Sequence, residues 1–284
     1  MPADEPEIQR LNQQHWLLTQ TKNGSLHSAP LGDGSGLKIL DIGCGSGIWC
    51  IQMAAEYPAA QIVGTDISPI QPKHKPENVE WTVFDMEADG WPFGAEKFDY
   101  VHLSLVHGCV ADWGKFMGKV LGFLRPGGWL EHQEFSLCRQ YLLDGDGGKV
   151  PLPEKVEELT PILRWGRLME KAADRRGRAL QLGPLLKEFH KDAGLQQVTE
   201  DIYPMPCGTW SSDPRKKELG AHFLLQTLGG VEGYSMIMFT KVLGWSVEDT
   251  NAFLEEVRRD ARDDSLRKVL DFHVVYSQKS RGGQ

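Results

Sequence analysis

The chain has 284 residues, of which 40% are hydrophobic and 25% are charged, a composition typical of ordinary globular proteins. Its 31 lysines and arginines against 39 aspartates and glutamates give a formal net charge of −8, which argues against a nucleic-acid-binding surface. No run of about 18 apolar residues occurs, so we expect neither a membrane span nor a membrane partner.

The first predicted element is a polar helical arm within residues 1–36, carried by the stretch EIQRLNQQHWLLTQ. Gly32, Gly34 and Gly36 then form a flexible joint. After this joint, short apolar runs alternate with helical patterns, which predicts βαβ units and a mainly parallel sheet. The expected strands cover residues 37–42, 61–65, 79–84, 98–104 and 129–135, and the expected helices cover residues 48–57 and 112–124.

The regular alternation of strand and helix patterns ends at about residue 152. We interpret the helices that follow as insertions, at about 152–178 and 210–265, into one α/β domain of residues 37–284. A separate second domain is the alternative. The expected helices cover residues 153–177, 184–193, 214–228, 232–243 and 247–262, and the expected strands cover residues 196–203 and 271–277.

The stretch DIGCGSG, which begins at Asp41, joins the first expected strand to the next helix. Gly43, Gly45 and Gly47 lack a Cβ atom, so the backbone there can adopt left-handed angles and approach a ligand closely. A dinucleotide site needs a third glycine at position 48, which is Ile48 here. The motif instead matches the S-adenosylmethionine pattern, and an acid beside the loop suits that cationic ligand better than a pyrophosphate.

A second acid, Asp66, ends the second expected strand, 19 residues after Gly47. Sheets of this kind bind their ligands beyond the carboxyl ends of the strands. A carboxylate at this point can accept hydrogen bonds from both ribose hydroxyls of a nucleoside, and a charge-assisted bond contributes about 1.5–3 kcal/mol.

In their order along the chain, LDIGCGSGIW, GTDISPIQP, FDMEADGWPF, FDYVHLS and LRPGGWLEHQE resemble the motifs of class I methyltransferases. RLNQQH, LHSAPL, GTWSSDPRKKELG and MFTKVLGWSVEDTNAFLEEVR resemble more narrowly the fungal LaeA-like group, also called the TAM or UMTA-type methyltransferases. The resemblance covers about residues 8–276. It implies a Rossmann-like α/β fold with a seven-stranded sheet whose last strand is antiparallel. Helical insertions are expected to form a substrate lid, with the arm of residues 1–36 over the cofactor site.

The resemblance also implies a site for S-adenosylmethionine, with S-adenosylhomocysteine as the product. In class I enzymes an acid at the position of Asp85 hydrogen-bonds the adenine amino group, and the next residue, at the position of Met86, packs on the adenine ring. A simple turn residue is the alternative for Asp85. No metal site is expected. The expected cofactor-binding residues are Asp41, Gly43, Cys44, Gly45, Gly47, Asp66, Ile67, Asp85, Met86 and Ser104.

Methyl transfer depends chiefly on alignment, so no side-chain base is obligatory, and O-, N- and C-methylation all stay open. Three residues are candidates for catalysis. His107, just after the fourth strand, can accept a proton at neutral pH, with a packing role as the alternative. His15, on the arm, can close the site. Glu134, near the end of the fifth strand, can reach the substrate cavity, or can serve the structure alone.

Two further expectations concern side chains around the site. Trp210 and the helix at residues 232–243 are expected to roof a hydrophobic acceptor pocket. His102 lies in the middle of the fourth strand, where we expect a core histidine whose polar atoms are paired.

We interpret the chain as an S-adenosylmethionine-dependent methyltransferase that acts on a small-molecule natural product of fungal secondary metabolism. One alternative is a LaeA-like regulatory protein that works in the nucleus with velvet-family partners. Another is a cyclase that binds the cofactor without methyl transfer. The regulator carries a longer N-terminal extension than the roughly 36 residues here, which favours a pathway enzyme. Five cysteines without a C-x-x-C pair, and an acidic N-terminus, predict a cytoplasmic protein.

Overall fold

The computed structural model describes residues 5–282. Its centre is one sheet with the strand order β3-β2-β1-β4-β5-β8-β6, in which β7 also pairs with β8. Neighbours among β1 to β5 are parallel, and β8 runs antiparallel to β5, β6 and β7. The strands are β1 (Lys38–Ile42), β2 (Gln61–Asp66), β3 (Val79–Val83), β4 (Phe98–Ser104), β5 (Leu124–Phe135), β6 (Tyr141–Leu143), β7 (Gln196–Cys207) and β8 (Arg267–Gln278).

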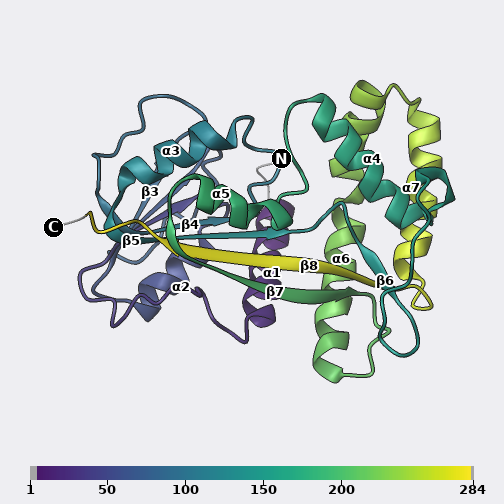
Figure 1. The fold of residues 1–284 in the computed structure, drawn as a ribbon, viewed down its shortest axis with the longest axis horizontal. Helices are drawn as coiled ribbons and strands as arrows, with labels where there is room; N and C mark the ends of the chain where they lie inside the picture. Colours follow the sequence, from purple (N-terminus) through teal and green to yellow (C-terminus); the bar gives the residue numbers. More distant parts are fainter. Residues whose placement is uncertain (1–4, 283–284) are drawn as a thin grey trace.

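The sheet has eight strands where seven are expected. The added strand is β6, whose three residues pair with the first residues of β8. β7 and β8 are also longer than predicted, and their pairing extends to Cys207 opposite Lys268. This extension carries the sheet beyond its parallel half toward the helices of the second half of the chain (Figure 1).

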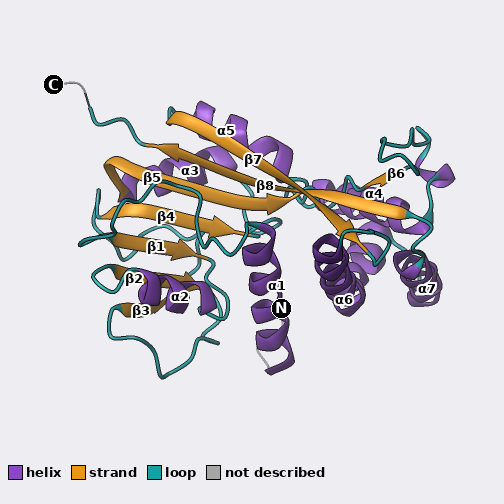
Figure 2. Ribbon diagram, turned by 90° about the horizontal axis from the view of Figure 1, so that it is seen from below, coloured by secondary structure: helices purple, strands orange, loops and turns teal. Residues whose placement is uncertain are grey.

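Helices cover both faces of the parallel strands. α2 (Ile48–Glu56) lies on one face, and α3 (Trp113–Phe123) and α5 (Leu186–Asp192) lie on the other (Figure 2). Successive residues of a strand point to opposite faces, so in β1 Ile39 joins the core beneath α2 and Leu40 joins the core beneath α3 and α5. Burial on both faces explains why these strands read as continuous apolar runs.

Three helices of the second half pack together beyond the carboxyl ends of the parallel strands (Figures 1 and 2). Their common core includes Trp165, Phe239 and Phe253. None of the helices within residues 5–282 combines the length and apolar character that crossing a membrane requires. The elements are α4 (Pro161–Arg175), α6 (Pro214–Ile237) with its π-helical continuation η3 (Met238–Leu243), and α7 (Val247–Arg262), with short 3₁₀ turns η1 (Val156–Glu158) and η2 (Gly183–Leu185).

Two predicted helix boundaries are wrong. The helix expected from residue 153 begins at Pro161, a residue well suited to the first helical position. The helices expected at 214–228 and 232–243 are one continuous element. The glycines do not break it, because a glycine costs a helix interior only about 1 kcal/mol and no proline follows Pro214 in this helix. A Cβ at Gly230 would lie 2.3 Å from Cε2 of Tyr234, so this glycine leaves room for the tyrosine ring.

A helix forms where the N-terminal arm is predicted. α1 (Glu5–Thr21) lies across the carboxyl edge of the parallel strands, between the sheet and α6 (Figure 2). Asn12 Oδ1 accepts a hydrogen bond from Ser46 Oγ at 2.7 Å, which joins α1 to the glycine loop.

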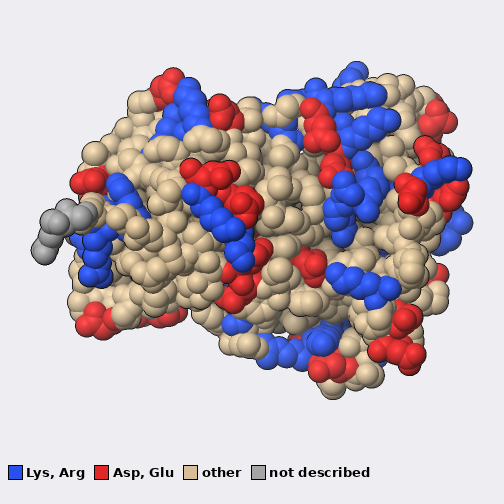
Figure 3. Space-filling view, viewed as in Figure 1, with Lys and Arg blue, Asp and Glu red and all other residues tan. Residues whose placement is uncertain are grey.

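The surface carries mixed charges. On the face seen in Figure 3, acidic and basic side chains are interspersed, and lysine and arginine gather over α4. Arg178 pairs with Glu87 at 2.6 Å, and Arg175 donates to the carbonyl of Val242 at 3.1 Å. Arg175 and Arg178, two of the basic side chains in this region, thus bind partners within the fold.

Candidate active site

The loop between β1 and α2 carries the three glycines of the motif. Gly43, Gly45 and Gly47 have φ angles of 76°, 53° and 77°, in the left-handed region that favours glycine. The N–H groups of Gly43 and Cys44 both donate to the carbonyl of Thr65, at 2.8 and 2.9 Å, which ties the loop to the end of β2. The loop geometry is therefore fixed by the protein itself.

Substitution of Gly47 tests this geometry. A Cβ at Gly47 would lie 2.5 Å from Cη2 of Trp81, whereas one at Gly24, with φ of 91°, would meet nothing within 4 Å. Both Gly→Ala changes introduce left-handed strain, but only Gly47→Ala also forces the indole aside. We expect Gly47→Ala to lower the free energy of unfolding by at least about 1 kcal/mol more than Gly24→Ala, measured by urea denaturation. Equal losses would mean that Trp81 moves freely.

The carboxylate of Asp66 stands at the end of β2 and is held by two backbone groups. Its Oδ2 accepts from the N–H of Gly45 at 2.9 Å, and its Oδ1 accepts from the N–H of Ser68 at 2.9 Å. Each carboxylate oxygen has a further lone pair. Asp66 is thus oriented by the glycine loop and can still accept hydrogen bonds from two ligand hydroxyls.

Apolar surface follows on the outer side of Asp66. Ile67 is 66% exposed, and Val83, the register partner of Asp66 on β3, is 58% exposed. Asp85 is also exposed, and its Oδ1 accepts from the N–H of Glu87 at 2.9 Å, so it does form a local turn. Met86 reaches back toward the loop, with its Cε 3.4 Å from where a Cβ of Gly43 would lie. The roles of these residues toward adenine stay predictions.

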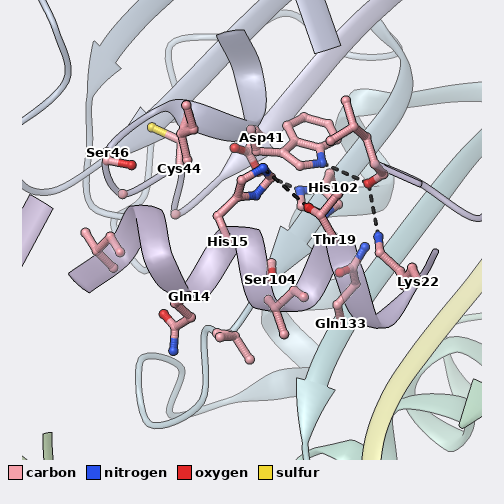
Figure 4. Close-up of a pocket in the computed structure, with 18 residues that line it drawn as sticks. Gln14, His15, Thr19, Lys22, Asp41, Cys44, Ser46, His102, Ser104 and Gln133 are labelled. Atoms are coloured by element: carbon pink, nitrogen blue, oxygen red, sulfur yellow. Dashed lines mark hydrogen bonds and ion pairs between the residues drawn. The ribbon is translucent and has the colours of Figure 1, made fainter. Parts of the chain in front are cut away.

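A pocket lies between the glycine loop and α1 (Figure 4). His15 lies on the wall formed by α1, and its Nε2 is 2.8 Å from Gln52 Oε1 on α2. Burial lowers the pKa of His15, and the bond to Gln52 opposes this only in part. Closure of the pocket by His15 stays a prediction. Polar side chains around the pocket include Gln14, His15, Lys22, Asp41, His102 and Gln133, and Cys44 and Ser104 also line it.

Asp41, the acid of the motif, is already engaged within the protein. Its side chain is buried, with Oδ1 2.8 Å from His102 Nδ1 and Oδ2 accepting from Cys50 Sγ at 3.3 Å. Asp41 nevertheless lines the pocket, and its role toward the ligand's cationic groups stays a prediction. The expectation that all polar atoms of His102 are paired is wrong, because its buried Nε2 has no hydrogen-bond partner among residues 5–282.

The turn after β4 brings two of the predicted catalytic residues together. Leu105 has a φ of 54°, unusual for a residue other than glycine, and donates to the carbonyl of Gln133 at 3.0 Å. Beyond this turn, His107 Nδ1 lies 2.9 Å from Glu134 Oε2, and the N–H of Val106 donates to Glu134 Oε1 at 2.7 Å. The backbone thus fixes the carboxylate, and the carboxylate fixes the imidazole.

Glu134 itself does not reach a cavity, since its side chain is fully buried. Burial alone raises the pKa of Glu134, but the charge and hydrogen bond of His107 outweigh it, so the pKa lies below its ordinary value. Glu134 is therefore placed to orient His107, and its part in catalysis stays a prediction. His107 is 19% exposed and lines a second cavity, where Nε2 is the nitrogen left for a ligand.

This second cavity lies between α1, α4, α6 and the end of β5. Gln14 lines both it and the pocket at the glycine loop, so the two spaces adjoin. The expectation that Trp210 and the helix at residues 232–243 cover this cavity is wrong in part. Trp210 donates to the carbonyl of Lys268 at 3.2 Å, and Phe239 belongs to the hydrophobic core of the helices. The cavity has aromatic walls with a few polar groups, among them Arg10, Phe135, Gln140, Trp165, Phe223, Gln226 and Tyr234.

Comparison with known proteins decides the family. A family model described as a methyltransferase domain matches residues 13–199. The chain belongs to the methyltransferase domain family. It is 36% identical over 98% of its length to methyltransferase pytC of Aspergillus terreus, of which the match covers 82%. It is 29% identical over 96% of its length to the secondary metabolism regulator LAE1 of Cochliobolus heterostrophus, of which the match covers 87%.

Solved structures show the same fold. The methyltransferase chain in a complex with the Haloferax volcanii Trm112 activator aligns with a TM-score of 0.53 and 14% identity, over 98% of this chain and 94% of that one. The protein is thus an S-adenosylmethionine-dependent methyltransferase with the class I fold that its motifs predict.

The residues present in this methyltransferase fit its cofactor. The left-handed glycine loop brings backbone close to the pocket, and Asp66 is oriented with free lone pairs. The unpartnered Nε2 of His102 lines the same pocket. The sequence signal for His102 lies in the strand order, because Asp41 and His102 are register partners on adjacent strands, and both are polar residues in apolar runs.

Proposed function

We propose that the enzyme methylates a hydroxyl group of a small natural product bound in the cavity beside His107. The pairing of His107 with buried Glu134 supports this most directly, because a carboxylate that holds Nδ1 leaves Nε2 as a proton acceptor. The pocket at the glycine loop and the cavity beside His107 also adjoin at Gln14, which supports the proposal further. O-methylation is thus our choice among the three types that the sequence leaves open.

The cofactor is proposed to lie between the glycine loop and α1. When bound, S-adenosylmethionine supplies a methyl group on a sulfonium. In our proposal Asp66 holds the ribose, the apolar surface of Ile67 and Met86 takes the adenine, and α1 excludes water. Alignment of acceptor and methyl group in such a site contributes about 7–11 kcal/mol to catalysis.

The walls of the second cavity indicate the class of acceptor. The rings of Phe135, Trp165 and Phe223 favour a flat or aromatic compound. The side-chain oxygens of Gln140 and Gln226 are buried without a hydrogen-bond partner. Because unpaired buried acceptors are costly, we propose an acceptor with at least two hydroxyl or N–H donors.

The acceptor can be found by label transfer. The purified enzyme, given methyl-labelled S-adenosylmethionine and metabolite fractions from a fungal culture, is expected to label a phenolic product one methylene heavier than its precursor. A product of unchanged mass that forms only with cofactor would favour the cyclase alternative. Transfer of label to a nitrogen or carbon atom would contradict the choice of a hydroxyl.

Asp66→Ala tests the place of the cofactor. The change removes the proposed ribose acceptor and the partner of Gly45 N–H, so the affinity for S-adenosylhomocysteine is expected to fall at least about tenfold. Isothermal calorimetry measures this directly. Asp33→Ala is the matched control, because Asp33 is exposed and accepts a local hydrogen bond from the N–H of Ser35 in a turn. Unchanged affinity for Asp66→Ala would place the nucleoside elsewhere.

A regulatory role with velvet-family partners is the second candidate, favoured by the similarity to LAE1 along nearly the whole chain. Pull-down of purified velvet proteins and cell fractionation separate the two candidates. A pathway enzyme in the cytoplasm, our proposal, should methylate a small molecule without such a partner. Stable capture of a velvet protein together with nuclear enrichment would favour the regulator.

A further inference from the structure

Buried polar residues form a row across three neighbouring strands beneath α1. Asp41 on β1 is the register partner of His102 on β4, and His102 is the register partner of Glu131 on β5. All three side chains are buried, at 3%, 2% and 0% exposure. The row runs along the floor of the pocket at the glycine loop, where Asp41 and His102 are among the lining residues.

The imidazole of His102 is held in place on two sides. Its ring stacks on Trp49 with a centroid distance of 4.0 Å and an interplanar angle of 4°. Its Nδ1 lies 2.8 Å from Asp41 Oδ1, so Nδ1 carries a proton that it donates to the carboxylate. The orientation of Nε2 is thereby fixed.

That fixed Nε2 lacks a partner. It is buried and makes no hydrogen bond, although a buried polar nitrogen without one is costly. The ring lines the pocket, opposite the α1 residues His15 and Thr19 (Figure 4). A group that enters the pocket can therefore supply the missing bond.

The charges along the row indicate which kind of group this is. Glu131 lies 3.9 Å from Lys22 Nζ, and His102 stands between two carboxylates. The pocket is thus lined by groups of both signs, Asp41 and Lys22, which suits a zwitterionic group such as an amino-acid end.

We propose that His102 Nε2 forms a hydrogen bond with the amino-acid end of the bound cofactor, and that Asp41 positions it for this task. The inference rests on the proposed cofactor site. Asp66 at the end of β2 takes the sugar, so the amino-acid end extends toward β1 and β4, where His102 lies. The acid of the glycine motif thus acts on the cofactor through the imidazole.

Two ligands separate this role from a merely structural one. S-adenosylhomocysteine carries the amino-acid end, and 5′-methylthioadenosine lacks it. His102→Asn retains an amide that can replace Nδ1 toward Asp41 but has no group at the place of Nε2. We expect His102→Asn to weaken binding of S-adenosylhomocysteine at least about tenfold in calorimetry, with binding of methylthioadenosine within about twofold.

His102→Gln is the matched control, because its longer amide reaches the place of Nε2. It should retain more of the affinity for S-adenosylhomocysteine than His102→Asn does. His102→Phe keeps a ring against Trp49 and removes both nitrogens, so it provides the same selective test if the Asn variant does not fold. Equal weakening of both ligands, or no weakening, overturns the assignment of His102.

A further variant keeps the two proposals apart. Asp66→Asn should weaken both ligands, because both carry the ribose. If Asp66→Asn weakens neither ligand, the proposed cofactor site itself is wrong, and the role of His102 falls with it. If Asp66→Asn weakens binding of both ligands, and His102→Asn also weakens binding of both ligands equally, only the inference about His102 is overturned.

Discussion

Replacing His107 by alanine is expected to lower kcat about 100-fold to 10,000-fold and to leave the affinity for S-adenosylhomocysteine within about twofold. The imidazole lines the acceptor cavity, and its Nδ1 is held by Glu134 at 2.9 Å. Without it, no oriented base takes the proton of the acceptor hydroxyl. The measurement is the rate with the acceptor found by label transfer, together with calorimetry of cofactor binding.

The control for this prediction is His74→Ala, because His74 is an exposed histidine in the loop before β3 and should leave kcat unchanged. Glu134→Gln removes the charge that positions His107, so kcat should fall and its pH profile should shift. If His107→Ala lowers cofactor affinity as much as turnover, His107 is a binding residue. If neither changes, the acceptor needs no base.

The parallel half of the fold could be predicted from sequence because each element there is coded locally. β4 was predicted with its observed bounds, since the apolar run of Phe98–Ser104 ends at a turn. The second half could be predicted less well. β6 has only three residues and exists because β8 offers an edge to it. The break expected in α6 is absent because the packing of the helix outweighs the small helix propensity of its glycines.

The candidate site likewise has a part that could be predicted from the sequence and a part that could not. The glycine loop and Asp66 lie in one contiguous segment, so their proximity follows from the motif, and the structure joins them through the bond from Gly45 to Asp66. The pairing of His107 with Glu134 joins a residue in the turn after β4 to a residue of β5, 27 positions away, and depends on the left-handed turn at Leu105. No local pattern encodes such a turn, so the two residues could be named as candidates but not as a pair.

Replacing Glu131 by alanine is expected to lower the free energy of unfolding by about 3–5 kcal/mol. Its Oε2 accepts from the N–H groups of Ser28 and Ala29 at 2.8 and 2.9 Å, and its Oε1 accepts from Gln133 Nε2 at 2.6 Å. It is also the partner of buried Lys22 at 3.9 Å. Removal leaves a buried ammonium and two backbone donors without their partner, and these groups hold the segment after α1 to the sheet.

Urea denaturation measures this loss, with Glu77→Ala as the control, because Glu77 is exposed on the loop before β3. Glu131→Leu combined with Lys22→Met removes both buried charges. The double variant should therefore lose less stability than the sum of the two single changes. Strict additivity would show that the two charges do not interact.

The same carboxylate gives the stability a pH dependence of known sign. Burial alone raises the pKa of Glu131, but the charges of Lys22 and His102 and the N–H donors of the 28–29 backbone outweigh it, so the folded pKa lies below its ordinary value. Such a group stabilises the fold fully above its unfolded pKa of about 4.3, and this contribution is lost as the pH falls through the folded pKa. Wild-type stability should therefore drop on acidification, and Glu131→Gln should flatten that part of the curve. An unchanged slope would assign the acid sensitivity to other carboxylates such as Glu134.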